Sequence, residues 1–204
     1  MTIGVLALQG DYDAHRKLID HASDVARVLE VRDEQTLAQC DGLILPGGES
    51  TTMSRLCDRY DLWQPLQDKL RGGMGAFGTC AGLIMLSQKI DGATKNFAQK
   101  TLGVLDVDVA RNAYGAQLDS FECDLNWEPN IDYSNQENQL MRAVFIRAPR
   151  ITRIGCDVEV LARHSGEAVA VRQGKIVACA FHPEIVGENA LHLLWLRALK
   201  SVKK

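Results

Sequence analysis

The first half of the chain alternates between short apolar runs and amphipathic stretches. Residues 2–8 form a nearly continuous apolar run, which is typical of a strand buried on both faces of a parallel sheet. Residues 11–21 follow with helical spacing, and Asp11 is a suitable N-cap. Further strands are predicted at 25–31, 42–45 and 73–77, and further helices at 51–60, 63–70 and 81–89. This alternation predicts a parallel sheet with helices on both faces.

The second half has a different pattern. Residues 102–110 alternate between apolar and polar side chains, which predicts a strand with one face in water. More strands are expected at 118–125, 141–147, 158–163, 168–172 and 175–180. Gln173-Gly174 predicts a tight hairpin between the last two strands, and a closing helix is expected from Gly187. The segment 126–139 is polar and contains Pro129, so it is expected to be a mobile loop, and residues 1–204 are expected to form one domain with an antiparallel extension.

Composition narrows the class of protein. A chain of 204 residues can bury a core that needs neither disulfides nor a metal. The formal net charge of −3 gives no reason to expect a nucleic-acid partner. No apolar run is long enough to cross a bilayer, and the N-terminus lacks the features of a signal peptide. We therefore expect a cytoplasmic protein that acts without a membrane.

The six cysteines are far apart and include no C-x-x-C pair. This spacing argues against a zinc site and against a disulfide framework. Five of them are expected to be small buried hydrophobic residues: Cys40, Cys57, Cys123, Cys156 and Cys179.

Cys80 differs because it lies in the sequence Gly-Thr-Cys-Ala-Gly, residues 78–82, between a predicted strand and a predicted helix. This is the form of a nucleophile elbow, in which glycines make room for a strained turn. A thiol at the helix N-terminus is favoured as thiolate, and the Ala81 N–H would point toward an oxyanion. A glycine-rich turn around a buried cysteine would look similar, so the motif needs partners.

A base and its orienting group are predicted at His182-Pro183-Glu184, directly after the strand at 175–180. In an extended segment residues two apart point the same way, so His182 and Glu184 should share one face at a strand's carboxyl end. Glu184 can then accept a hydrogen bond from one imidazole nitrogen, and the other nitrogen can take the thiol proton.

The other histidines are expected to be structural or surface residues without a catalytic role. Two fall on the first helix, one at a turn beside Ser165-Gly166 and one on the polar side of the last helix: His15, His21, His164 and His192, respectively.

A third informative segment is Leu-Pro-Gly-Gly-Glu-Ser-Thr-Thr, residues 45–52. Its glycines permit close approach of the backbone to a ligand, and the Gly48 N–H could complete an oxyanion hole with that of Ala81. Taken alone, Pro-Gly-Gly is simply a turn.

With these three segments, the sequence resembles the class I (triad) glutamine amidotransferases. More narrowly, it resembles the glutaminase subunits of ribose 5-phosphate-dependent pyridoxal 5′-phosphate synthases. The elbow and His-Pro-Glu indicate only the superfamily, whereas Gly-Gly-Glu-Ser-Thr-Thr and Phe-Ile-Arg-Ala-Pro narrow it. The matching blocks span nearly the whole chain: residues 4–10, 45–53, 78–84, 111–115, 119–122, 145–149 and 181–184.

The resemblance implies a three-layer, flavodoxin-like α/β fold with a mostly parallel central sheet. It also implies that Cys80 is the nucleophile, His182 the general acid-base and Glu184 its orienting residue. The implied contacts to glutamine are Gly48, Glu49, Ser50, Arg111, Ile146 and Arg147. An acid and a cation suit the α-ammonium and α-carboxylate of free glutamine, but the pairing stays open. Ala116 departs from the family, where Arg is frequent.

The implied reaction is hydrolysis of L-glutamine to L-glutamate and ammonia through a glutamyl thioester, with no metal or organic cofactor. The implied partner is a ring-forming (β/α)₈-barrel synthase that combines the ammonia with a pentose phosphate and a triose phosphate. Three alternatives remain. The first is an amidotransferase serving another synthase, of histidine or purine biosynthesis. The second is a cysteine peptidase or esterase, and the third is an interaction subunit with an inactive site.

Overall fold

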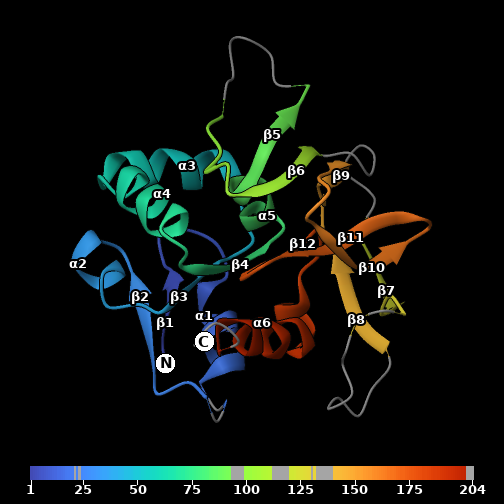
Figure 1. Ribbon diagram of the computed structural model, residues 1–204, viewed down its shortest axis with the longest axis horizontal. Helices are drawn as coiled ribbons and strands as arrows, with labels where there is room; N and C mark the ends of the chain where they lie inside the picture. The colour runs from blue at the N-terminus through green and yellow to red at the C-terminus, as the bar shows by residue number, and fades with distance from the viewer. Residues whose placement is uncertain are drawn as a thin grey trace.

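A seven-stranded sheet forms the centre of the computed structural model, which describes residues 1–20, 22, 24–92, 99–111, 120–129, 131 and 140–200 (Figure 1). Its strand order is β10-β11-β12-β4-β3-β1-β2. Five strands run parallel: β1 (Thr2–Leu6), β2 (Arg27–Val31), β3 (Gly42–Leu45), β4 (Gly75–Thr79) and β12 (Ile176–Cys179). At one edge β11 (Glu167–Gln173) and β10 (Glu159–His164) are antiparallel to their neighbours. The predicted, mostly parallel sheet is confirmed.

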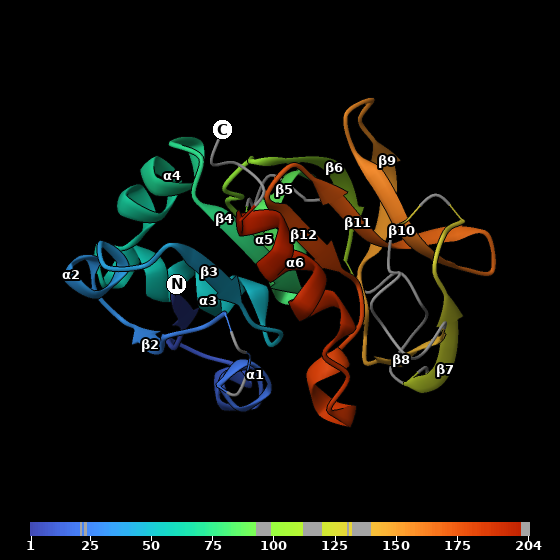
Figure 2. The same ribbon diagram turned by 60° about the horizontal axis from the view of Figure 1, so that its bottom comes forward.

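Helices cover both faces of this sheet (Figures 1 and 2). One face carries α1 (Tyr12–Ile19) and α6 (Ala190–Lys200). The other carries α3 (Ser50–Arg59), α4 (Trp63–Arg71) and α5 (Ala81–Leu86). A short helix, α2 (Glu34–Leu37), links β2 to β3 and contacts α4. The predicted three-layer α/β arrangement is therefore confirmed.

Two smaller sheets make the predicted extension of the second half. One contains β5 (Ser87–Asp91), β6 (Leu105–Ala110) and β9 (Arg150–Ile154). The other is the antiparallel pair of β7 (Phe121–Asn126) and β8 (Leu140–Phe145). A bridge between Trp127 and Ala162 joins the latter pair to the central sheet. Along β6 buried and half-buried residues alternate, as the hydrophobic pattern predicts.

Several predicted boundaries are confirmed and others are wrong. The hairpin at Gln173-Gly174 forms with Gln173 opposite Ile176. The helix predicted at 81–89 ends instead at Leu86, because the Ser87 hydroxyl bonds the Ile84 carbonyl and the backbone becomes extended into β5. The closing helix begins at Ala190, after a 3₁₀ turn, η2 (Pro183–Val186). The strand β9 and the helix α2 have no counterpart in the prediction. His21, Ala116 and most of the loop at 126–139 lie outside the described residues.

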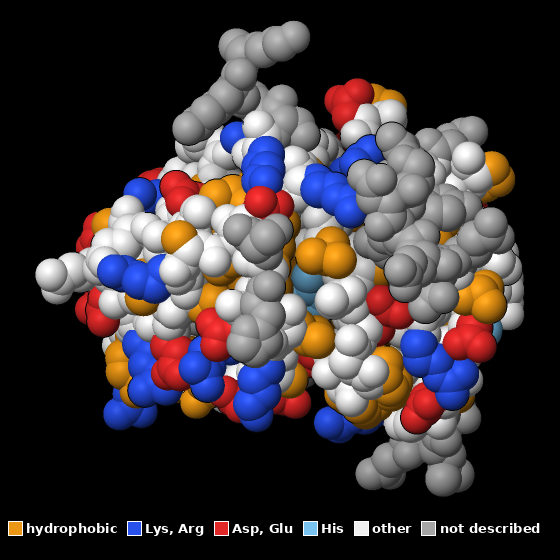
Figure 3. Space-filling model, turned by 90° about the horizontal axis from the view of Figure 1, so that it is seen from below, with side chains coloured by type: hydrophobic (Ala, Val, Ile, Leu, Met, Phe, Trp, Pro, Cys, Tyr) orange, Lys and Arg blue, Asp and Glu red, His pale blue; other side chains and the backbone are white. Residues whose placement is uncertain are grey.

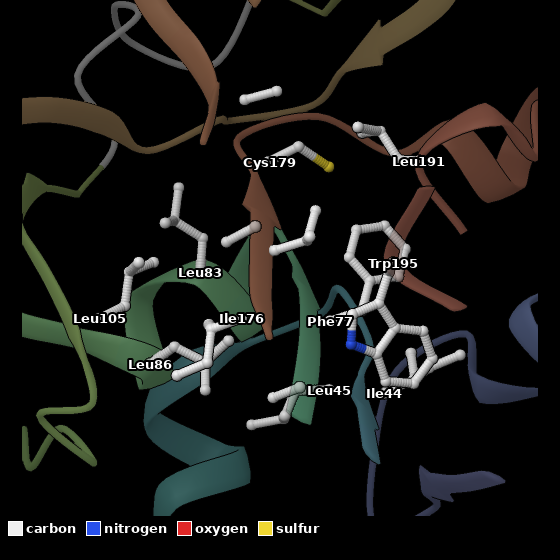
Figure 4. Close-up of a cluster of buried hydrophobic side chains, with 14 of the residues drawn as sticks. Ile44, Leu45, Phe77, Leu83, Leu86, Leu105, Ile176, Cys179, Leu191 and Trp195 are labelled. Atoms are coloured by element: carbon white, nitrogen blue, oxygen red, sulfur yellow. The ribbon is translucent and has the colours of Figure 1, made fainter. Parts of the chain in front are cut away.

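The core packs against both faces of β3, β4 and β12 (Figure 4). Because strand side chains alternate, Ile44 lies on the α6 side with Phe77 and Trp195, and Leu45 lies on the α5 side. All four side chains are fully buried.

The prediction that His192 lies on a polar side of the last helix is wrong. This side chain is fully buried and packs edge-on against Phe77, with ring centroids 4.7 Å apart. The reason is that α6 is buried over most of its circumference, so that His192 faces the core whereas Arg197 and Lys200 are exposed.

The cysteines are all free, and three of the five expected to be buried are buried. Cys123 is half-buried, and Cys156 is exposed because it lies in the turn between β9 and β10.

No described helix combines the length and the hydropathy needed to span a bilayer. On the face shown in Figure 3, the described Lys and Arg side chains are interspersed with Asp and Glu rather than gathered into one patch.

The core position of Phe77 predicts a large loss of stability on truncation. Phe77→Ala should lower the free energy of unfolding by about 3–5 kcal/mol, because it removes a fully buried aromatic ring and leaves a cavity. Tyr60→Ala, at a side chain that is 54% exposed, should change it by less than about 0.5 kcal/mol. Urea unfolding of the two variants measures both values, and equal losses would contradict this description of the core.

Candidate active site

The strand β4 turns directly into α5 at Cys80, whose backbone has φ 47° and ψ −98°. A positive φ is strained for a residue with a side chain and is typical of a nucleophile elbow. The turn is possible because its neighbours are glycines. A Cβ on Gly78 would lie 2.7 Å from the carbonyl carbon of Gly82, and one on Gly82 would collide with the Leu45 carbonyl oxygen. The predicted elbow is therefore present.

Cys80 is 6% exposed, and it lines a pocket rather than being sealed in the core. It is the N-cap of α5, so Ala81 carries the first amide of that helix. An amide in this position has no partner within its own helix, and the adjacent helix dipole favours negative charge. The local structure thus suits a thiolate and an oxyanion.

The imidazole of His182 joins Cys80 to Glu184. His182 follows β12, and its Nδ1–H donates to Glu184 Oε1 over 2.8 Å. The ring also forms a side-chain hydrogen bond with Cys80. Burial alone lowers the pKa of His182, but the hydrogen bonds to Cys80 and Glu184 outweigh it and raise the pKa to about 10. The three predicted residues are therefore brought together, with a proton held on the imidazole.

Gly47 forms the wall against which this imidazole lies. A Cβ on Gly47 would be 2.6 Å from Nδ1 of His182 and closer still to the ring carbon between the two nitrogens. Gly48, the next residue, has φ 145° and lies against the side chain of Gln9, which accepts a hydrogen bond from Glu49 N over 2.9 Å. The loop after β3 therefore has to be glycine at both positions to approach the histidine and Gln9.

A pocket with a cavity volume of about 220 Å³ lies beside the thiol. It is lined by Gly48, Glu49, Ser50, Cys80, Ile84, Arg111, Ile146, Arg147 and His182. These nine residues include all six predicted contacts to glutamine. Glu184 and Ala81 do not line it, and both are buried behind its wall.

Glu49 is held by the start of α3 rather than left free in the pocket. Its carboxylate accepts from the backbone N–H groups of Thr51 and Thr52 over 3.0 and 2.6 Å, and from Arg111 Nη2 over 3.2 Å. Partial burial raises the pKa of Glu49, but hydrogen bonds from Thr52 and Thr51 outweigh this and lower the pKa to about 2. The pocket therefore presents a fixed negative charge next to a fixed positive one.

Gln99 is a site residue that the sequence analysis missed. Its side-chain oxygen accepts from Arg111 Nη1 over 2.9 Å, from the Ser50 hydroxyl over 3.1 Å and from the Thr51 hydroxyl over 3.4 Å. It thus ties together two walls of the pocket that are 61 residues apart in sequence. No motif marks Gln99, so only the folded chain reveals it.

The arrangement is suited to acyl transfer from a small substrate. The sulfur of Cys80 faces a pocket, the His182 imidazole adjoins it, and the Glu184 carboxylate orients that ring. Among the residues that the structure describes, no group of three or more His, Cys, Asp or Glu side chains is arranged to hold a metal ion.

Family, sequence and structure comparisons with known proteins all find similarity to glutamine amidotransferases or to pyridoxal 5′-phosphate synthase subunits. A model of the SNO glutamine amidotransferase family matches residues 5–201. A protein of Acidothermus cellulolyticus named pyridoxal 5′-phosphate synthase subunit PdxT is 47% identical over 199 residues, covering 95% of this chain and 91% of that protein. The protein of the same name from Streptomyces avermitilis is 44% identical, with coverages of 98% and 94%. A solved structure described as a glutamine amidotransferase superimposes with a TM-score of 0.83 at 40% identity, covering 97% of this chain and 98% of that one.

The contact between Gly47 and His182 predicts that a single methyl group will disable the thiol. Gly47→Ala should push the imidazole away from Cys80 and slow alkylation of Cys80 by iodoacetamide at pH 7 by at least about tenfold, because the sulfur loses its imidazole partner. Peptide mass spectrometry measures the rate, with the exposed Cys156 as an internal reference that should not change. An unchanged rate at Cys80 would show that the ring is not held against this loop.

The low pKa of Glu49 predicts a loss of stability in acid. A carboxyl group whose pKa is lowered by folding stabilises the protein above its ordinary value of 4.5, and this contribution disappears as the pH falls toward 2. The difference in unfolding free energy between the native protein and Glu49→Gln should therefore be constant above pH 4.5 and shrink below it. Chemical unfolding at a series of pH values measures this difference, and a difference that grew in acid would contradict the capping role.

Proposed function

The chain belongs to the SNO glutamine amidotransferase family, and we propose on this premise that it hydrolyses glutamine through Cys80, His182 and Glu184. It is the glutaminase subunit of a pyridoxal 5′-phosphate synthase; its relatives carry the name pyridoxal 5′-phosphate synthase subunit PdxT. Residues 1–204 are assigned to one glutaminase domain. The observation that supports the triad most directly is the hydrogen-bonded series from Cys80 through His182 to Glu184, beside a small pocket with charged walls.

In the first half of the reaction the Cys80 thiolate attacks the side-chain amide carbon of L-glutamine. The carbonyl oxygen becomes an oxyanion, which the N–H groups of Gly48 and Ala81 stabilise; loss of one such donor typically costs about 10²–10³ in rate. The His182 imidazolium gives its proton to the amide nitrogen. The carbon–nitrogen bond then breaks, which releases ammonia and leaves a γ-glutamyl thioester on Cys80.

In the second half water enters the place of ammonia. His182, now neutral, takes one proton from the water as its oxygen attacks the thioester carbon. The carbon–sulfur bond breaks, so that L-glutamate leaves and the thiolate and imidazolium return. Glu184 accepts from Nδ1 throughout and keeps the other imidazole nitrogen facing the reacting atoms.

The pocket supports recognition of a free amino acid. Its volume of about 220 Å³ is small, and Glu49, Arg111 and Arg147 supply charges of both signs. The α-ammonium and α-carboxylate of glutamine would bind these charges, and the polar atoms of Ser50 and the backbone at Ile146 complete the contacts. Because Gln99 and Glu49 both hold Arg111, this cation is in place before substrate arrives.

The ammonia produced requires an acceptor close to the site, because in bulk water it would become ammonium and lose its nucleophilicity. A synthase subunit docked over the pocket would receive it. The family resemblance supports a ring-forming (β/α)₈ barrel as this subunit, with pentose and triose phosphates as its other substrates, in the cytoplasm.

The rival functions are separated by different observations: the acceptor of ammonia, the shape of the pocket and the intact triad. An amidotransferase serving a synthase of histidine or purine biosynthesis would use the same triad, and transfer of ammonia to each candidate synthase separates these cases. A peptidase would need an extended groove, whereas the thiol faces a small pocket with charged walls. The intact triad weighs against a subunit that only interacts.

Removing either reacting group should abolish hydrolysis of glutamine. Cys80→Ala and His182→Asn, assayed by glutamate release with the synthase present, should each lower kcat by at least about 10³-fold, because the nucleophile and its base act as a unit. Binding to the synthase should persist in both variants, since these side chains are almost fully buried.

Tyr60→Ala changes an exposed side chain at the C-terminal end of α3 and serves as the control, which should keep native activity. Full glutaminase activity in Cys80→Ala or in His182→Asn would overturn the triad.

A further inference from the structure

Three polar side chains lie behind the triad in a position that the proposed reaction does not use. His15 on α1, Thr79 at the end of β4 and His192 on α6 are each 0% exposed. Neither histidine has a catalytic role predicted from the sequence. They form a buried cluster beside the carboxylate oxygen of Glu184 that does not contact His182 Nδ1.

The cluster touches the triad through His15. Its Nε2 lies 3.6 Å from Glu184 Oε2 and 3.2 Å from the Thr79 hydroxyl. Its Nδ1 lies 2.9 Å from His192 Nε2. The distance to Glu184 is longer than a standard hydrogen bond, but catalytic hydrogen bonds are frequently long in the absence of substrate and shorten in the complex.

Both histidines are neutral. Burial, reinforced by the unfavourable electrostatic interaction that a charged His15 would have with the His192 and His182 rings, lowers the pKa of His15 well below its usual value. Burial lowers the pKa of His192 to about 3. Each ring therefore carries a single N–H, and the question is which nitrogen holds it.

The buried atoms that lack partners indicate which ring nitrogen of each histidine carries the proton. Within the described part of the chain, Glu184 Oε2 and His192 Nδ1 are buried and have no hydrogen-bond partner. A carboxylate oxygen needs a donor, and the nitrogen nearest to it is His15 Nε2. If Nε2 carries the proton, Nδ1 accepts from the Nε2–H of His192, and His192 Nδ1 is a bare lone pair.

The opposite pair of tautomers leaves two buried polar groups without a hydrogen-bond partner. If His15 carried its proton on Nδ1, Glu184 Oε2 would have no donor, and His192 would hold a buried N–H at Nδ1 with no acceptor among the described residues. Each unsatisfied buried group destabilises the folded state. The first set of tautomers therefore leaves fewer buried groups unpaired: His192 donates to His15, the Nε2–H of His15 faces both the Thr79 hydroxyl and Glu184 Oε2, and His182 donates to the other oxygen of Glu184.

We propose that His15 is a positioning residue of the triad, which donates its Nε2–H to Glu184 Oε2 and so holds Oε1 toward His182, with His192 fixing the tautomer of His15. This role rests on the proposed function of the triad. The donations all point toward the carboxylate, so each bond polarises the next. Glu184 is thereby held from both sides, although only one of its oxygens touches the catalytic imidazole.

The tautomers can be measured without any assay of activity. In the full chain labelled with ¹⁵N-histidine, long-range ¹H–¹⁵N correlation spectra should show His15 and His192 neutral, each protonated on Nε2 and bare on Nδ1, between pH 6 and 8. His15→Gln and His192→Gln identify the signals. A proton on Nδ1 of His15, or a charged His15 ring, would overturn the proposal.

Kinetics separate positioning from simple packing. His15→Leu removes the donor and should lower kcat for glutamine about 10–100-fold, the usual cost of losing an outer partner that orients a functional side chain. KM should stay within about twofold, because His15 does not line the pocket. His15→Gln places an amide donor near the position of Nε2 and should recover most of kcat. His164→Gln, at a histidine on β10, is the matched control and should leave kcat unchanged.

The outcomes distinguish this proposal from the triad itself. If Cys80→Ala is inactive while His15→Leu retains native kcat, only the role of His15 is wrong. If His15→Leu and His15→Gln lose equal activity and equal thermal stability, His15 is a packing residue and the proposal fails. Should His15→Leu not fold, the tautomers of the native protein decide the question. Activity in Cys80→Ala would remove the triad on which the proposal rests, and the proposal with it.

Discussion

The site depends on one contact, the hydrogen bond between the sulfur of Cys80 and the imidazole of His182. About a hundred residues separate the two in the chain, and the pairing of β4 with β12 brings them together. The register places Thr79 opposite Cys179, and the N–H of Cys80 donates to the carbonyl of Cys179 over 2.9 Å. Because the strands are parallel, both chains leave the sheet at the same edge, where sheets of this class place their sites. A shift of register by one residue would move the histidine away from the sulfur.

Glycine makes the close approach of three segments possible at this edge. Gly82 lets α5 pack onto the end of β3, Gly47 lets the following loop lie against the imidazole, and Gly10 with φ 91° leaves room for the carbonyl of Gly47. A side chain at any of these positions would collide with backbone or with the histidine. The strained backbone of Cys80 persists because the packing around it leaves no relaxed alternative. The packed sheet thus holds the sulfur atom of Cys80 in one position.

The charged side chains of the pocket are held in place by contacts with neighbouring helix and loop residues. Glu49 caps α3 and pairs with Arg111, while Gln99 binds Arg111 and Ser50 at once. The groups that face a substrate are therefore already oriented by helix and loop contacts, and little ordering remains to oppose binding. Behind the triad, the buried histidines extend the same principle, since Glu184 is contacted on both sides by imidazole rings.

The sequence by itself determined the alternation of elements, the elbow at Cys80, the His-Pro-Glu segment and the candidate pocket residues, because these follow from local periodicity and from residue types required at short spacing. It also identified the family, through blocks that span the chain. Only the tertiary structure decided that α5 gives way to β5 at Ser87, that His192 is buried, and that Gln99 and His15 contact the site. These facts depend on which surfaces face one another after folding. A lone glutamine or histidine carries no local pattern that distinguishes a buried hydrogen-bond partner from a solvated side chain.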